Sequence, residues 1–341
     1  MHRRGFLQWG GAAAVAGAAS GVEANFKAPG EEIRQPAPAG ARLLRLALAP
    51  GYELAGFAAD RLAHRIALAT GGRFRIERGE PGAPCDLSFG DVNGLTALHP
   101  GFAFFAGLPA GTGLPSAELN AWLVLGGGQL LWDDLARPFG LKTLVAGLSE
   151  CGGLWSNVRL EQPSDLAGLP VAAEGLAARV LERLGARPSQ VAPNDLGAAL
   201  ARGEVAAAQW AGPLPAVAFD LAPLAPCLYQ PGLCEGGTLT ALTLAGGLWD
   251  ELASADQVVF EACAAQEYRL QGAEAKLHAG LTAGVRPQPK WPVHRGLPTA
   301  LSEAMTAAAR AVVADLAAHD ATCRAIVASY EAYRSWRGIG V

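Results

Sequence analysis

The sequence has 341 residues, of which 51% are hydrophobic and 17% are charged, and its formal net charge is −4. This composition is too apolar for a disordered chain, and the length allows two lobes with cores of their own. The sequence contains no block of basic residues, so nucleic acid is excluded as an expected partner.

Residues 1–24 have the layout of a signal peptide. Arg3 and Arg4 precede a weakly apolar run rich in glycine and alanine, which is typical of the twin-arginine export route. The run is too short to cross the roughly 30 Å hydrocarbon core of a bilayer, so we interpret it as a cleaved signal rather than an anchor. We therefore expect a periplasmic protein in which residues 25–40 form a flexible leader.

The next part of the sequence predicts a β-α-β-β opening. We expect strands at 42–49, 73–79 and 85–91 and, after the first of them, an amphipathic helix at 53–72 that ends in glycines. A helical stretch follows at 116–137, although three consecutive glycines interrupt it, and a strand at 141–148 comes next.

The rest of the sequence alternates between short strands and helices. A turn enters a strand at 163–173, and further strands are expected at 189–193, 205–210 and 238–245. Helices are expected at 175–186 and at 195–204, the second capped by Asn194, before two long helical stretches at 246–279 and 297–336. This alternation indicates α/β lobes with mainly parallel sheets.

The sequence lacks the motifs of the common enzyme classes. It contains no GxGxxG after a strand, no P-loop, no GxSxG elbow and no HExxH, and its six histidines are scattered without metal-ligand spacing. The six cysteines include no CxxC pair and predict no disulfide framework. No nucleophile, base and orienting group come together in the sequence, so we expect no enzyme.

Two segments carry a resemblance to a known family. Residues 163–213 read PSDLAGLPVAAEGLAARVLERLGARPSQVAPNDLGAALARGEVAAAQWAGP, and residues 229–237 read YQPGLCEGG. These segments resemble the solute receptors of TRAP transporters of the DctP type. The resemblance implies a type II-like periplasmic binding protein fold, with two α/β lobes and one ligand in the hinge cleft. Lobe I would comprise 41–148 and about 237–290, and lobe II 149–236 and about 291–341.

The resemblance also implies a set of ligand-binding residues. In the keto-acid branch of the family three positions hold a metal ion together with the ligand, and these positions fall on Glu150, Trp210 and Glu235. An exposed turn carboxylate is the alternative interpretation of Glu235. Phe219 is a further candidate for the wall of the cleft, although the sequence does not distinguish it from a core residue.

One departure from the family pattern changes the expected charge of the site. Ala172 occupies the position at which the family carries an arginine that binds the ligand carboxylate. Glu174 lies two residues later, on the same face of the predicted strand. Because neighbouring buried carboxylates need a cation, we expect Ca²⁺ or Na⁺, and an oxygen-rich, doubly anionic site favours Ca²⁺.

The sequence therefore predicts an exported receptor that captures a small organic solute, in particular an organic acid held through a metal ion, for the membrane subunits of a TRAP transporter. An organic cation held by the acids and Trp210 is an alternative ligand. A metal-dependent enzyme on a related fold, a sensory subunit and a receptor without solute binding are alternative functions. We also expect a monomer, because the C-terminal region after residue 336 lacks the extra helix of dimeric relatives.

Overall fold

The computed structural model describes residues 38–49, 56–80, 83–109, 111–149, 151–211, 221–233, 237–284 and 293–339. The predicted signal peptide lies outside these ranges, as does nearly all of the predicted leader. Among the described residues, no helix combines the length and the apolar character that a membrane crossing requires.

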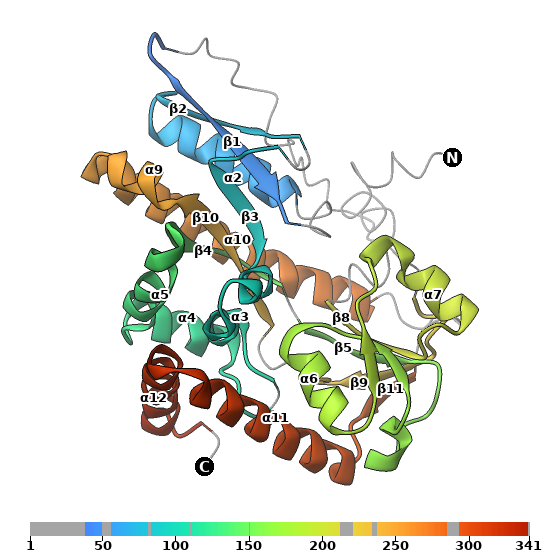
Figure 1. Cartoon of the computed structure of the whole chain (residues 1–341). Helices are drawn as coiled ribbons and strands as arrows, with labels where there is room; N and C mark the ends of the chain where they lie inside the picture. The colour runs from blue at the N-terminus through green and yellow to red at the C-terminus, as the bar shows by residue number, and fades with distance from the viewer. Residues whose placement is uncertain are drawn as a thin grey trace, which may run out of the picture.

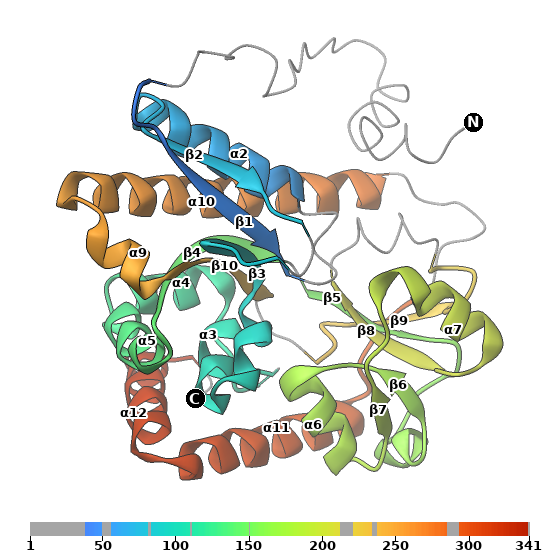
Figure 2. The ribbon, with the colours of Figure 1, turned by 45° about the horizontal axis from the view of Figure 1, so that its top comes forward.

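The first of two sheets has the strand order β2-β1-β3-β10-β4 (Figure 1). Its strands are β1 (Arg42–Leu48), β2 (Phe74–Arg78), β3 (Leu87–Asp91), β4 (Leu141–Ser149) and β10 (Thr238–Ala245). The apolar residues Leu44 and Leu46 alternate along β1 and are buried against one face of the sheet. Helices α2 (Gly56–Ala69) and α10 (Ser254–Gly284) contact each other and cover this part of the molecule (Figure 2).

The second sheet has the order β11-β9-β5-β8-β6-β7. Its strands are β5 (Cys151–Ser156), β6 (Pro170–Ala172), β7 (Arg187–Ser189), β8 (Ala207–Ala211), β9 (Cys227–Gln230) and β11 (Val293–Gly296). Helices α6 (Gly175–Arg183) and α7 (Leu196–Arg202) connect the successive strands β6, β7 and β8. The sheet is therefore built from short α/β units, as the alternation in the sequence predicts.

Both sheets are mixed. In the first, β1 runs parallel to β2 and β3, whereas β10 runs antiparallel to β3 and β4. In the second, β5 runs antiparallel to β8 and β9, while the remaining pairs are parallel. All of the antiparallel pairs involve β5 or β10. Each of these two strands follows a strand of the other sheet, so no βαβ unit connects it to its neighbours.

The C-terminal helices contact both halves of the molecule. Helix α11 (Thr299–His319) packs against α6, and helix α12 (Ala321–Trp336) packs against α5 (Gly128–Ala136), which follows α4 (Ser116–Val124). Phe105 of α3 (Ala103–Ala106) stacks on Trp122 and Trp132, and Tyr330 of α12 meets Trp122 edge-on. The bounds that we predicted for the two lobes stay a prediction.

Two local predictions are wrong. Strand β7 begins at Arg187, whereas the sequence predicted a strand at 189–193, because pairing with β6 begins opposite Pro170. Asn194 does not cap α7: it lies within a 3₁₀ turn (Pro193–Asp195), and Asp195 occupies the capping position without a side-chain hydrogen bond. The proline fixes this turn and displaces the helix start by one residue.

Candidate functional site

The two sheets are joined where β4 leads into β5. β4 ends at Ser149 in the first sheet and β5 begins at Cys151 in the second, so only position 150 separates them. Ser149 is paired with Thr238 at the start of β10, and Cys151 is paired with Ala211 at the end of β8. The ends of four strands therefore meet at this crossing.

Three of the predicted site residues, Glu150, Phe219 and Glu235, lie outside the described residues, and the side chain of Trp210 does as well. The backbone of Trp210 lies on β8, next to the last residue of that strand. Along the chain, Glu150 stands between β4 and β5, and Glu235 shortly precedes β10. The predicted metal ligands thus flank strand ends that meet at the crossing.

Strand pairing is irregular on both sides of the crossing. The register shifts between Thr240 and Ala241 where β10 pairs with β4, and it shifts again near the start of β5. Gly153 of β5 has a φ of +86°, and a Cβ atom there would lie 2.5 Å from the carbonyl oxygen of Tyr229. Glycine is therefore required at this position, and the bulges redirect the backbone next to the predicted site.

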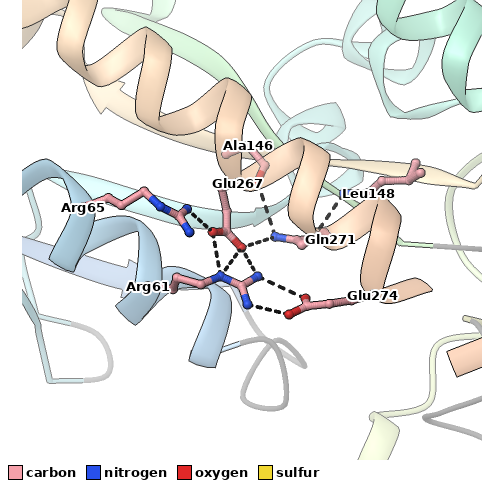
Figure 3. A network of polar contacts seen from close by, with 7 residues as sticks. All are labelled: Arg61, Arg65, Ala146, Leu148, Glu267, Gln271 and Glu274. Carbon is pink, nitrogen blue, oxygen red and sulfur yellow. Dashed lines mark hydrogen bonds and ion pairs between the residues drawn. The ribbon is translucent and has the colours of Figure 1, made fainter. Parts of the chain in front are cut away.

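Gln271 of α10 holds the end of β4 through both atoms of its amide (Figure 3). Its side-chain oxygen accepts a hydrogen bond from the N–H of Leu148 at 3.2 Å, and its side-chain nitrogen donates to the carbonyl of Ala146 at 3.3 Å. Gly147 leaves room for this amide, since a Cβ atom there would lie 2.2 Å from Oε1 of Gln271. Backbone groups freed by the bulge are therefore satisfied by a helix side chain.

A buried ion cluster below Gln271 links α10 to α2 (Figure 3). Glu267 is fully buried and accepts hydrogen bonds from Nε of Arg61 at 2.9 Å and from Arg65 at 3.0 Å. Burial lowers the pKa of Arg61, but its bonds to Glu267 and Glu274 raise that pKa overall, so the guanidinium stays charged. Because a buried carboxylate without these cations would be costly, the cluster fixes α10 against α2 and with it the anchor of β4.

The contact between Gly147 and Gln271 gives a first prediction. Gly147→Ala should lower the free energy of unfolding by about 1–3 kcal/mol, because the added methyl overpacks the amide of Gln271. Gln271→Ala opens that space, so the second substitution should remove most of the cost of the first. Urea unfolding of both single variants and the double variant measures the coupling, and additive losses would contradict this placement of Gln271.

The structure adds one acid that sequence reasoning missed. Asp91 ends β3, and its Oδ1 accepts the backbone N–H of Asn93 at 2.6 Å. Gly175, with a φ of +60°, approaches from the start of α6, and a Cβ atom there would lie 3.1 Å from Oδ1 of Asn93. Burial raises the pKa of Asp91 to about 7, and the charge of Glu174 adds to this shift. The charge of Glu174, which precedes α6, thus acts on Asp91 at the end of β3. The signal that could have found Asp91 was its place at the end of a predicted strand.

Glu174 and Ala172, the two predicted site residues whose side chains the structure describes, have different surroundings. Glu174 is exposed at the start of α6 and forms no capping bond. Ala172 is buried in an apolar cluster that also contains Trp155 and Leu228, so an arginine there would have to leave that cluster. Arg179, the next arginine along the chain, lies 3.8 Å from Asp315 of α11.

The raised pKa of Asp91 gives a second prediction. Because the pKa in the folded state lies above the usual value of 3.8, the folded protein holds this proton over a pH range in which the unfolded chain has lost it. This contribution to stability is present below pH 4 and is lost as the pH rises to about 7. Asp91→Asn should therefore be more stable than the wild type at pH 8, by about 1–3 kcal/mol, and the two should converge at low pH. Urea unfolding across this range, with the exposed Asp250→Asn as a control, tests the expectation. A difference between wild type and Asp91→Asn that does not change with pH would contradict it.

A second group of metal-ligand type lies elsewhere among the described residues. Atoms of His99, Asp320 and Cys323 lie within 4.8 Å of one another. Nδ1 of His99 accepts the N–H of Gly101 at 3.1 Å, so the ring proton sits on Nε2 and points to Asp320 at 2.8 Å. Asp320 also caps α12 through the N–H of Cys323. Since Nε2 carries the proton, its lone pair is not free for a metal, and we interpret the group as a pair of linked helix caps.

A family model matches the central part of the chain. The model for bacterial extracellular solute-binding proteins, family 7 (DctP), matches residues 113–279. A monocarboxylate 2-oxoacid-binding periplasmic protein of Nostoc sp. (strain PCC 7120) is 30% identical over 219 residues. These residues make up 60% of this chain and 59% of that relative, so the match spans less than two thirds of its length.

Solved structures share the fold. A TRAP periplasmic solute binding protein from Colwellia psychrerythraea, with bound calcium and pyruvate, gives a TM-score of 0.80 at 21% identity and covers 87% of this chain and 97% of its own. One from Pseudoalteromonas atlantica T6c, with bound sodium and pyruvate, gives 0.79 at 21% identity and covers 87% of this chain and 95% of its own. The prediction of a two-lobe α/β binding-protein fold is confirmed by this likeness.

Proposed function

We propose that the chain belongs to family 7 of the bacterial extracellular solute-binding proteins, and that it captures a small organic acid between its two lobes and delivers it to the membrane subunits of a TRAP transporter. The observation that carries this proposal is the meeting of four strand ends at the crossing between the sheets, beside the positions of the predicted ligands. The 2-oxoacid-binding relative and the pyruvate-bound structures support a short monocarboxylate, with 2-oxo acids as the first class to test.

We propose that the solute is held together with a cation by Glu150, Glu235 and Trp210. The support comes from charge. The sequence places no arginine or lysine from Leu160 to Ala178, so the segment that carries the family arginine offers no positive partner for a solute carboxylate. Among the described residues, Glu174 and Asp91 interact through their charges, and neither supplies a positive partner. Carboxylate oxygens suit a hard ion such as Ca²⁺ or Na⁺, and several acids favour Ca²⁺. When bound, the cation would neutralise these acids and attract the carboxylate of the solute.

A cationic organic solute is the second candidate ligand. The charge interaction between Asp91 and Glu174 favours it, because an ammonium group bound by both carboxylates would remove their repulsion. Such a solute would bind without a metal ion and would lose affinity when either acid is neutralised. We propose that in either case the chain binds and releases its solute unchanged.

Calorimetry with pyruvate distinguishes an organic acid held through a metal ion from a cationic organic solute. In the presence of calcium the wild type should bind pyruvate, and a chelator should abolish binding, since no fixed cation replaces the metal ion. Glu235→Gln should weaken binding at least tenfold, which corresponds to about 1.4 kcal/mol. Glu182→Gln, on the exposed side of α6, serves as the matched control for charge and should bind like the wild type. Pyruvate binding that is unchanged by chelation would contradict the metal-bridged site, and binding of amines alone would favour the second candidate.

We propose that residues 1–24 direct export by the twin-arginine route and that the mature chain works in the periplasm. Lysine would keep the charge of the paired arginines but not their planar guanidinium groups, so we expect the signal to be lost. Replacing Arg3 and Arg4 with lysine should therefore leave full-length precursor in the cytoplasm. Cell fractionation followed by mass determination measures this, and normal maturation of the variant would show that another route exports the chain.

A further inference from the structure

A polar cavity lies on the half of the molecule that carries the six-stranded sheet. Its volume is about 290 Å³, and it is lined by Arg159, Leu160, Glu161, Tyr229, Arg295, Gly296 and Pro298. These residues follow the end of β5, lie on β9 and β11, and precede the start of α11. The crossing lies at the opposite end of β5, since Cys151 begins that strand and Ser156 ends it. The cavity is thus separate from the proposed solute site.

The cavity contains an arginine that has no counter-ion among the described residues. Nε of Arg295 is buried, and in the described part of the chain it has no hydrogen-bond acceptor; no ion pair to this guanidinium occurs there either. Arg159, by contrast, is paired with Glu161 through its Nε at 2.5 Å. The charges of the lining residues therefore leave one positive charge in excess. A buried donor of this kind costs free energy unless a ligand or water accepts its hydrogen bond.

Two further features of the cavity favour an anionic ligand. The hydroxyl oxygen of Tyr229 accepts the N–H of Leu160 at 2.6 Å, which leaves the hydroxyl proton free to be donated. Burial raises the pKa of this hydroxyl, so it remains protonated at neutral pH. Helix α11 begins at the wall of the cavity, and its capping residue Pro298 supplies no side-chain bond to the first turn. The N-terminus of a helix of 21 residues adds partial positive charge.

We propose that this cavity is an anion site that binds a small carboxylate between the guanidinium of Arg295 and the hydroxyl of Tyr229. The planar guanidinium matches a carboxylate in shape and charge. Nothing in this site requires a metal ion. Its ligand therefore binds independently of the cation proposed for the crossing, and its occupancy does not depend on the proposed function.

The test measures thermal stability with acetate and with succinate, at constant ionic strength and with a chelator present. The chelator removes the cation and so prevents binding at the metal-bridged site, and constant ionic strength keeps general screening effects the same in all samples. Both anions should raise the melting temperature of the wild type in a saturable manner. Arg295→Gln should weaken the apparent affinity at least tenfold, whereas Glu235→Gln should leave it unchanged. Arg202→Gln is the matched control, because Arg202 is an exposed arginine on the same half of the molecule.

Arg295→Lys is a second variant that tests whether the lower affinity of Arg295→Gln results from a loss of folding. Lysine keeps the charge but not the planar pair of donors, so its affinity should fall between those of the wild type and Arg295→Gln. The proposal is overturned if neither anion stabilises the wild type, or if Arg295→Gln responds as the wild type does. A response lost in both Arg295→Gln and Glu235→Gln would also overturn it, since that result would assign the anions to the proposed solute site.

Discussion

The placement of the candidate site depends on one constraint: the backbone leaves one sheet and enters the other within a single residue. Ser149 is still paired in the first sheet and Cys151 is already paired in the second. Such a change of direction needs irregular backbone on both sides, and the register shifts together with Gly147 and Gly153 provide it. The chemistry proposed for Glu150 rests on its place in the chain, between the last residue of β4 and the first residue of β5.

The crossing would be poorly fixed without support from a helix. A bulge leaves backbone groups without strand partners, and at β4 these groups bind the amide of Gln271. Gln271 lies one helical turn from Glu267, which is buried and neutralised by Arg61 and Arg65. Since the arginines come from α2, the position of β4 depends on contacts across two helices. This arrangement costs desolvation of several charges, and it specifies one position of the strand end rather than adding much stability.

Sequence patterns predicted most of the fold and only part of the site. The strands of the first sheet and the long helices were predictable because apolar periodicity continues over many residues, as in β1 and α2. The start of β7 and the cap at Asn194 were not, since they depend on pairing and on one local turn. Ala172 was expected to be the position of a missing charge, and it lies in an apolar cluster. Asp91 was missed because its burial and its charge interaction with Glu174, which is distant in the sequence, arise only in the folded chain.

The charge proposed for the crossing distinguishes this chain from the pattern of the family that it resembles. Two acids, Glu150 and Glu235, are proposed for this site and Ala172 replaces the arginine of the family pattern, so we propose that an organic acid requires a cation to bind. Native mass spectrometry of the mature protein, purified from its own periplasm without added metal, tests this claim most directly. The account predicts one calcium or sodium ion together with one small carboxylate per chain, both lost on treatment with acid. A chain that carries an organic acid without any metal ion would contradict it.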